Sequence, residues 1–100
     1  MKRPVILRRS ARAEFDAAAD WYEKRSPGRG PDFTAAVRQA LDLIAEEPLR
    51  FAVVHGEVRE ADVRRYPHVI YYRPDSDVIH VLAVFHPARD PAVWQARADG

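Results

Sequence analysis

The stretch VIHVLAVF, residues 78–85, is apolar at every position except His80. A short apolar run that is bounded by turn residues is typical of a strand covered on both of its faces. We therefore predict that residues 78–85 form the central strand of a sheet. His80, inside this run, is interpreted as a histidine with a structural role.

A second strand is expected just before this one. Residues 69–73, Val-Ile-Tyr-Tyr-Arg, are rich in β-branched and aromatic side chains. The sequence Pro-Asp-Ser-Asp at 74–77 is typical of a turn, and so short a connection requires antiparallel pairing. Tyr71 and Tyr72 then point to opposite faces, and one of them is expected on an exposed sheet surface.

Two further strands have weaker patterns. Residues 57–65 are polar and alternate weakly, as in a half-exposed strand. In such a strand the adjacent Arg64 and Arg65 point to opposite faces. Residues 4–9 begin with a proline and carry three apolar side chains, which predicts a short N-terminal strand.

The intervening chain has the spacing of two helices. Ala11, Phe15, Ala18 and Tyr22 recur at helical intervals, and Ser10 is placed to cap this helix, predicted over 11–25. Trp21 and Tyr22 are interpreted mainly as core residues. Residues 26–30, Ser-Pro-Gly-Arg-Gly, form a turn, and a second apolar stripe continues to residue 47, before a proline. A short loop between helices implies an antiparallel hairpin.

The predicted order is β-α-α-β-β-β, an α+β fold in which a helical hairpin covers one face of an antiparallel sheet. The opposite face is expected to be partly open, because the tail at 87–100 is predicted to form only a helical turn around 92–97. The whole chain, residues 1–100, is expected to be one domain, as its length suggests.

Composition excludes several classes of protein. The chain has no cysteine, which rules out disulfides and thiolate metal sites, and no pair of His or carboxylate residues has metal-ligand spacing. We expect neither a metal nor a cofactor. The N-terminus lacks the apolar run of a signal peptide or membrane span, so the expected location is cytoplasmic. The net charge is only +1.

Several separated segments together resemble the RelE/ParE toxin superfamily, and its ParE branch more than the other. Residues 63–72, VRRYPHVIYY, are similar to the family segment R-x-F/Y-P-Y-x-I-x-Y, and residues 81–97 are close to its ending V-x-x-V-x-H-x-x-R-D/N-P-x-x-W-x-x-R. Further matches lie in the predicted helices and just after them: Ala13-Glu14, Trp21-Tyr22-Glu23, Phe33, Pro48 and Phe51.

The resemblance implies the same α+β fold and a growth-inhibiting toxin that a cognate antitoxin protein silences. One branch of the superfamily binds and inhibits DNA gyrase, and the other cleaves mRNA on the ribosome. We expect the first, with gyrase as target, no membrane association and no sequence-specific DNA binding by this chain. Ribosome-dependent mRNA cleavage is the alternative, and a degenerate domain without a potent target is a third interpretation.

The residues favour binding over cleavage. The cleaving branch typically has a sheet face rich in Lys and Arg and a tyrosine near the C-terminus. Here no lysine follows Lys24, and Trp94, whose indole is no practical acid or base, stands near the end. If the chain is an enzyme, His86, Arg65 and Arg89 are the candidate catalytic residues. Otherwise His86 is expected to hydrogen-bond and position residues 87–91, and no residue is catalytic.

For the binding interpretation we select side chains of the strand-rich half and the tail. Arginine forms bidentate contacts with carboxylates, and aromatic side chains are good anchors for a partner. The predicted antitoxin- or target-binding residues are Arg59, Arg64, Arg65, Tyr72, Arg73, Arg89 and Trp94.

Overall fold

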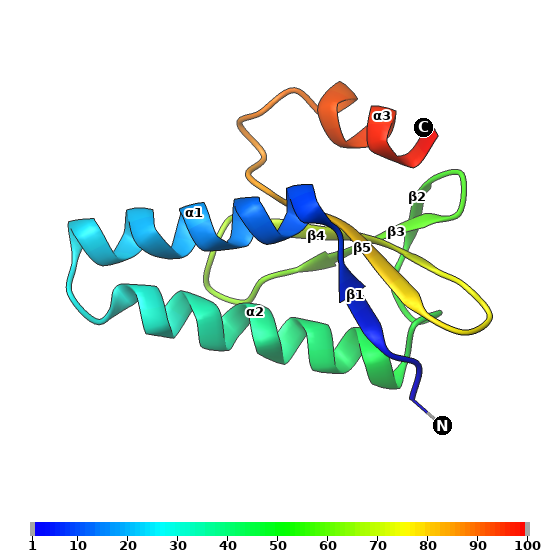
Figure 1. Ribbon diagram of the computed structural model, residues 1–100, viewed down its shortest axis with the longest axis horizontal. Helices are drawn as coiled ribbons and strands as arrows, with labels where there is room; N and C mark the ends of the chain where they lie inside the picture. The colour runs from blue at the N-terminus through cyan, green and yellow to red at the C-terminus, as the bar shows by residue number, and fades with distance from the viewer. Residues whose placement is uncertain (1, 100) are drawn as a thin grey trace.

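The computed structural model describes residues 2–99 and has eight helices and strands within them (Figure 1). Met1 and Gly100, which belong to the predicted domain, lie outside the described residues. The strands are β1 (Val5–Leu7), β2 (Val53–His55), β3 (Val58–Asp62), β4 (Val69–Pro74) and β5 (Ile79–Phe85). The helices are α1 (Arg9–Arg25), α2 (Arg29–Glu46) and α3 (Ala92–Asp99). Among residues 2–99 no helix combines the length and apolarity needed to cross a membrane.

The sheet has the strand order β1-β5-β4-β3-β2. β4 and β5 pair antiparallel, as their short connection predicts, and β1 pairs parallel to β5 with Val5 opposite Ile79. Every residue of β5 except His80 is at most 2% exposed, which agrees with the prediction of a strand covered on both faces. The α+β arrangement and the order of the predicted elements are confirmed, and β2 and α3 are added to them.

The hairpin of α1 and α2 covers one face of the sheet with the larger core. Phe33 of α2 lies at its centre, and its ring is 5.0 Å from those of Tyr66 and His68 and 5.1 Å from that of Tyr22. Apolar side chains from both helices and all the longer strands complete this core: Ala11, Phe15, Ala36, Val37, Ala40, Ile44, Ala61, Val63, Ile70, Tyr72, Ile79, Val81 and Val84.

The opposite face carries a second, smaller core under α3. The Trp94 indole stacks on the Tyr71 ring with 3.9 Å between centroids, and it packs with Val58, Leu82 and Phe85. The tail was predicted to form only a helical turn around 92–97, whereas α3 has eight residues and covers a portion of this face. The sequence signal is weak because α3 is short and buries only Trp94 among its side chains.

Two local predictions need correction. β3 ends at Asp62, and Arg64 and Arg65 lie in the turn to β4, where Arg65 has a φ of 72°. They are therefore not neighbours on a strand with opposite directions. Ser10 is not the N-cap of α1, because the Arg8 N–H continues the strand pairing to Val81 O and the helix begins at once at Arg9.

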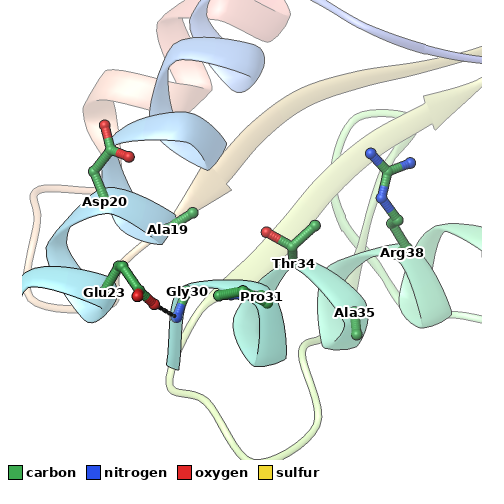
Figure 2. A pocket seen from close by; sticks show the side chains of 8 residues that line it. All are labelled: Ala19, Asp20, Glu23, Gly30, Pro31, Thr34, Ala35 and Arg38. Carbon is green, nitrogen blue, oxygen red and sulfur yellow. Dashed lines mark hydrogen bonds between the residues drawn. The ribbon is translucent and has the colours of Figure 1, made fainter. Parts of the chain in front are cut away.

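The two long helices approach each other closely at Gly30. A Cβ atom at Gly30 would lie 2.9 Å from Glu23 Cβ and 3.0 Å from the Ala19 carbonyl oxygen. The Glu23 carboxylate of α1 also accepts the backbone N–H of Gly28 at 2.9 Å and that of Gly30 at 3.0 Å. Figure 2 shows the bond to Gly30. One acidic side chain of α1 thus satisfies the N-terminus of α2, where a negative charge is favourable.

We expect Gly30→Ala to lower the free energy of unfolding by about 1–3 kcal/mol, because the added methyl group must push the helices apart. Urea unfolding followed by circular dichroism measures this change, with Gln39→Ala on the exposed side of α2 as a near-neutral control. A Gly30→Ala protein as stable as the wild type would contradict the close approach.

Candidate functional site

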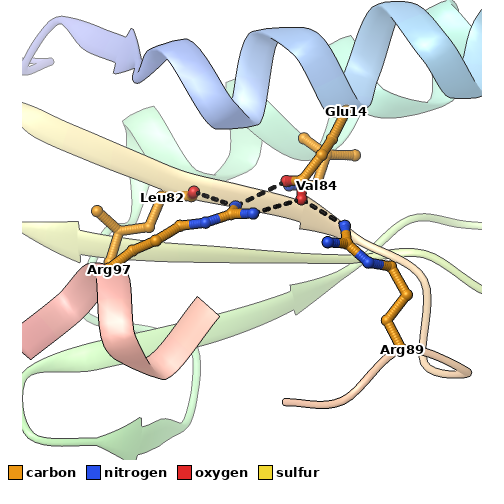
Figure 3. Close-up of polar contacts among 5 residues, drawn as sticks. All are labelled: Glu14, Leu82, Val84, Arg89 and Arg97. Atoms are coloured by element: carbon orange, nitrogen blue, oxygen red, sulfur yellow. Dashed lines mark hydrogen bonds and ion pairs between the residues drawn. The ribbon is translucent and has the colours of Figure 1, made fainter. Parts of the chain in front are cut away.

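One carboxylate connects α1, β5 and the C-terminal segment. Glu14 of α1 receives Arg97 Nη1 at 3.0 Å and Nη2 at 2.8 Å, a bidentate pair, and Arg89 Nη1 at 2.7 Å (Figure 3). The Val84 N–H donates to the same carboxylate at 3.1 Å, and Arg97 Nη1 donates to the Leu82 carbonyl at 3.0 Å. We call Glu14, Arg89 and Arg97 the Glu14 cluster.

The cluster forms where β5 has no neighbouring strand. β1 ends at Leu7, and its pairing with β5 reaches only Val81. The polar backbone groups of Leu82 and Val84 beyond that point would be left without partners, and such groups are costly when buried. Glu14 and Arg97 supply the acceptor and the donor that a longer β1 would have supplied.

The electrostatics of the cluster favour an ionised Glu14. Burial alone raises the pKa of this carboxyl, but the hydrogen bonds from Arg97 and Arg89 and the charge of Arg97 outweigh burial and lower the pKa. The Glu14 side chain is 13% exposed and that of Arg89 is 45% exposed. Arg89, whose guanidinium lies 4.5 Å from the centre of the Phe85 ring, is thus the accessible cation of the cluster.

Most of the arginines predicted to bind a partner are engaged within the chain. Arg59 donates to the carbonyl oxygens of Leu49 and Phe51 at 3.0 and 2.7 Å, and so holds the segment between α2 and β2. Arg73 is half-buried and approaches the Ala98 carbonyl of α3 at 3.4 Å.

The turn between β3 and β4 holds two more of these arginines. Arg64 is exposed at the edge of a cleft of about 380 Å³ that α2 forms with the end of β3. Arg65 is exposed and lies 3.4 Å from Asp32 of α2. The Asp32 carboxylate also accepts the Tyr66 hydroxyl, whose hydrogen bond is the main cause of its lowered pKa.

The two aromatic residues predicted to touch a partner are buried. Tyr72 is fully buried in the larger core, and its hydroxyl donates to the Pro48 carbonyl at 2.7 Å. Trp94 lies on the face of α3 that packs on the sheet, and it is 3% exposed. Neither side chain reaches a binding surface, so the expectation for both is corrected. Tyr71, not Tyr72, lies on the face away from the hairpin, and Trp94 of α3 packs on it.

Trp21, interpreted as a core residue, is instead 51% exposed. It borders a pocket of about 410 Å³ that is lined by Ala17, Ala18, Trp21, Tyr22, His68 and His86, and that we call the Trp21 pocket. The helical period could have predicted this exposure, because the apolar stripe runs through Phe15 and Tyr22 and Trp21 lies beside that stripe. His68 lies in the segment 63–72 on which the family resemblance depends, but it was not among the selected site residues.

The three candidate catalytic residues are held by different partners. Arg65 faces Asp32, Arg89 faces Glu14, and His86 Nδ1 accepts the Ala88 N–H at 3.0 Å, as expected for a histidine that positions residues 87–91. Within residues 2–99 no hydrogen bond or ion pair joins these three side chains to one another. The same residues contain no group of three His, Asp or Glu side chains that could hold a metal ion.

Comparison with known proteins places the chain in a family. The profile of the family described as "ParE toxin of type II toxin-antitoxin system, parDE" matches residues 5–91. The chain belongs to the ParE toxin family. The resemblance seen in the sequence is thereby confirmed. No curated protein matches the chain at a significant level.

A solved structure shares the fold of this ParE-family chain. It is titled "Chromosomal ParDE TA system from P. aeruginosa", and it superposes with a TM-score of 0.75 at 18% sequence identity. The match covers 85% of this chain and 96% of the other. The family match ends at residue 91, one residue before α3, so the helix that covers the second sheet face lies outside it.

We expect the Glu14 cluster to stabilise the folded chain. Glu14→Gln keeps the size of the side chain but leaves Arg97, which is only 22% exposed, without its counter-charge. We expect the free energy of unfolding to fall by about 2 kcal/mol, below the value for a fully buried pair. Chemical unfolding measures it, and Glu46→Gln, which removes the exposed pair with Lys2, is the matched control, expected to cost under about 1 kcal/mol. Equal losses would contradict the role of the cluster.

We expect His68 to make the free energy of unfolding depend on pH. Burial first, and the neighbouring His86 second, lower the pKa of His68 from 6.5 to about 4. Between these values the unfolded chain binds the proton and the folded chain does not, so stability falls as the pH falls. Between pH 7.5 and 5 this histidine should cost the wild type about 2 kcal/mol of unfolding free energy. His68→Phe should remove that loss and His80→Gln should keep it. An unchanged pH dependence in His68→Phe would contradict the assignment.

Proposed function

We propose that the chain inhibits growth by binding DNA gyrase, without chemistry of its own, and that a cognate antitoxin protein neutralises it by covering part of its surface. Membership of the ParE toxin family supports the antitoxin partner. Binding is preferred over cleavage because Arg65, Arg89 and His86 each interact with a different part of the chain. An RNA-cleaving site needs its acid, base and phosphate-binding groups directed at one substrate.

The exposed surface is consistent with protein contacts. Trp21 is half-exposed, and Arg64, Arg65 and Arg89 reach solvent. Tryptophan and arginine are the side chains most enriched among residues that dominate protein–protein affinity. Contacts of this kind hold a target or an antitoxin without any reaction.

We expect the purified chain to inhibit DNA supercoiling by bacterial gyrase in a concentration-dependent manner, while leaving relaxation by a type I topoisomerase unchanged. His86→Ala should still inhibit, since no chemistry is required of its ring. Agarose gel separation of the topoisomers measures both reactions.

The contrary result is equally specific. Supercoiling that proceeds normally, together with mRNA cuts at codon-spaced positions in a translating extract, would overturn the binding proposal in favour of mRNA cleavage. Loss of those cuts in His86→Ala would then identify the catalytic histidine.

A further inference from the structure

The Trp21 pocket lies between α1 and the chain that flanks the strands. Its lining residues come from α1, from the position just before β4, and from the position just after β5. Its walls are mainly methyl groups and aromatic rings, and no lining side chain is a carboxylate, an ammonium or a guanidinium. A pocket with these walls favours an apolar or flat aromatic group over an ion.

Trp21 is held in place at the edge of this pocket. The Trp21 ring meets the Tyr22 ring edge-on, with 5.1 Å between the two centroids. The Arg25 guanidinium lies 4.0 Å from the centroid of the Trp21 ring. An exposed side chain that is already ordered loses little entropy when a partner covers it. Trp21 is therefore prepared to contact a ligand although the chain alone leaves it half-exposed.

His68, one of the lining residues, has unused hydrogen-bonding capacity. The side chain is 7% exposed, and its Nδ1 atom is buried without a partner among the described residues. Its neutral ring contributes one N–H donor and one acceptor nitrogen. A buried polar atom without a partner costs free energy, so a ligand that brings a hydrogen-bonding group to this ring is favoured.

His86 adds a donor of known position. Because its Nδ1 accepts the Ala88 N–H, the neutral ring must carry its proton on Nε2. The two imidazole rings lie 5.2 Å apart, nearly perpendicular to each other. The combination of apolar walls and imidazole nitrogens suits a ring that has one polar atom at its edge, such as a phenol.

Cations lie at both ends of the pocket along α1. Arg25 is one turn beyond Trp21, and Arg89 is held at the level of Glu14, one turn before Ala17 and Ala18. The charge of Glu14 is already balanced by Arg97. Asp20, which also belongs to this part of α1, lines a separate cleft between α1 and α2 (Figure 2). The edge of the Trp21 pocket therefore favours acidic residues in whatever enters it.

We infer that the Trp21 pocket is an anchor site for the antitoxin, and that it receives an aromatic side chain, tyrosine above all, from an acidic segment of that protein. The inference rests on the proposed function, because it names the place at which the neutralising partner is held. Aromatic anchors in fitted pockets, with charged residues around them, are the usual arrangement at the centre of such interfaces.

The first test uses p-cresol, the side chain of tyrosine, as a probe of the full-length chain. The four histidines give separate ring signals in a proton–carbon NMR spectrum. We expect saturable shifts of the His68 and His86 signals, and none at His55 and His80, which lie outside the pocket. Ala17→Leu, which fills the pocket from an exposed position of α1, should abolish the shifts, and Ala13→Leu, one turn earlier, should retain them.

The second test concerns the partner. The probe is the blocked peptide Glu-Glu-Leu-Tyr-Glu-Glu, which should displace p-cresol. Replacing its tyrosine by alanine should weaken binding about tenfold, and replacing its four glutamates by lysines should weaken it by a similar factor. Trp21→Ala should also weaken the binding of the parent peptide by about tenfold.

Each failure has its own meaning. Absence of p-cresol shifts at His68 and His86, or shifts that persist in Ala17→Leu, would overturn the pocket as a binding site. Binding of p-cresol without competition by the peptide would overturn the protein partner in favour of a small aromatic ligand. Neither result depends on gyrase, so a chain that fails to inhibit supercoiling would refute the proposed function and leave the pocket measurements standing.

Discussion

The carboxylate of Glu14 holds the fold together at the point where the sheet is incomplete. β1 is only three residues long, so the second half of β5 has no strand beside it. Glu14 binds the Val84 N–H, and Arg97 binds both Glu14 and the Leu82 carbonyl. Charge-assisted hydrogen bonds thus replace a missing strand, and they tie α3 to α1 across the edge of β5.

This tie decides which surfaces a partner can reach. With Arg97 held, α3 lies on the second face of the sheet and Trp94 stacks on Tyr71. That face is therefore less open than a two-layer fold would leave it. The accessible aromatic surface lies instead on α1, where Trp21 stands beside His68. The structure thus presents a helix-bordered pocket more than a bare sheet.

The arginines show why composition was a poor guide to the site. Seven binding residues were predicted mainly from their charge or aromatic character. Arg59 Nη1, however, donates to the carbonyl oxygens of both Leu49 and Phe51, and Tyr72 lies within the core. A guanidinium has five donors and will satisfy any unpaired carbonyl within reach. Which carbonyls are unpaired depends on where strands end, and no local pattern reveals that.

Periodicity and turn residues were enough to predict the helical hairpin, the pairing of the last two strands and the α+β class, because these depend on near neighbours in the chain. The parallel position of β1, the α3 cover and the Glu14 cluster needed the tertiary structure. Glu14 meets Arg97 across 83 positions, and Tyr22 meets His68 only after the hairpin has folded onto the sheet. Contacts between such distant residues follow from how complete each strand is, which is a property of the whole sheet and not of any segment.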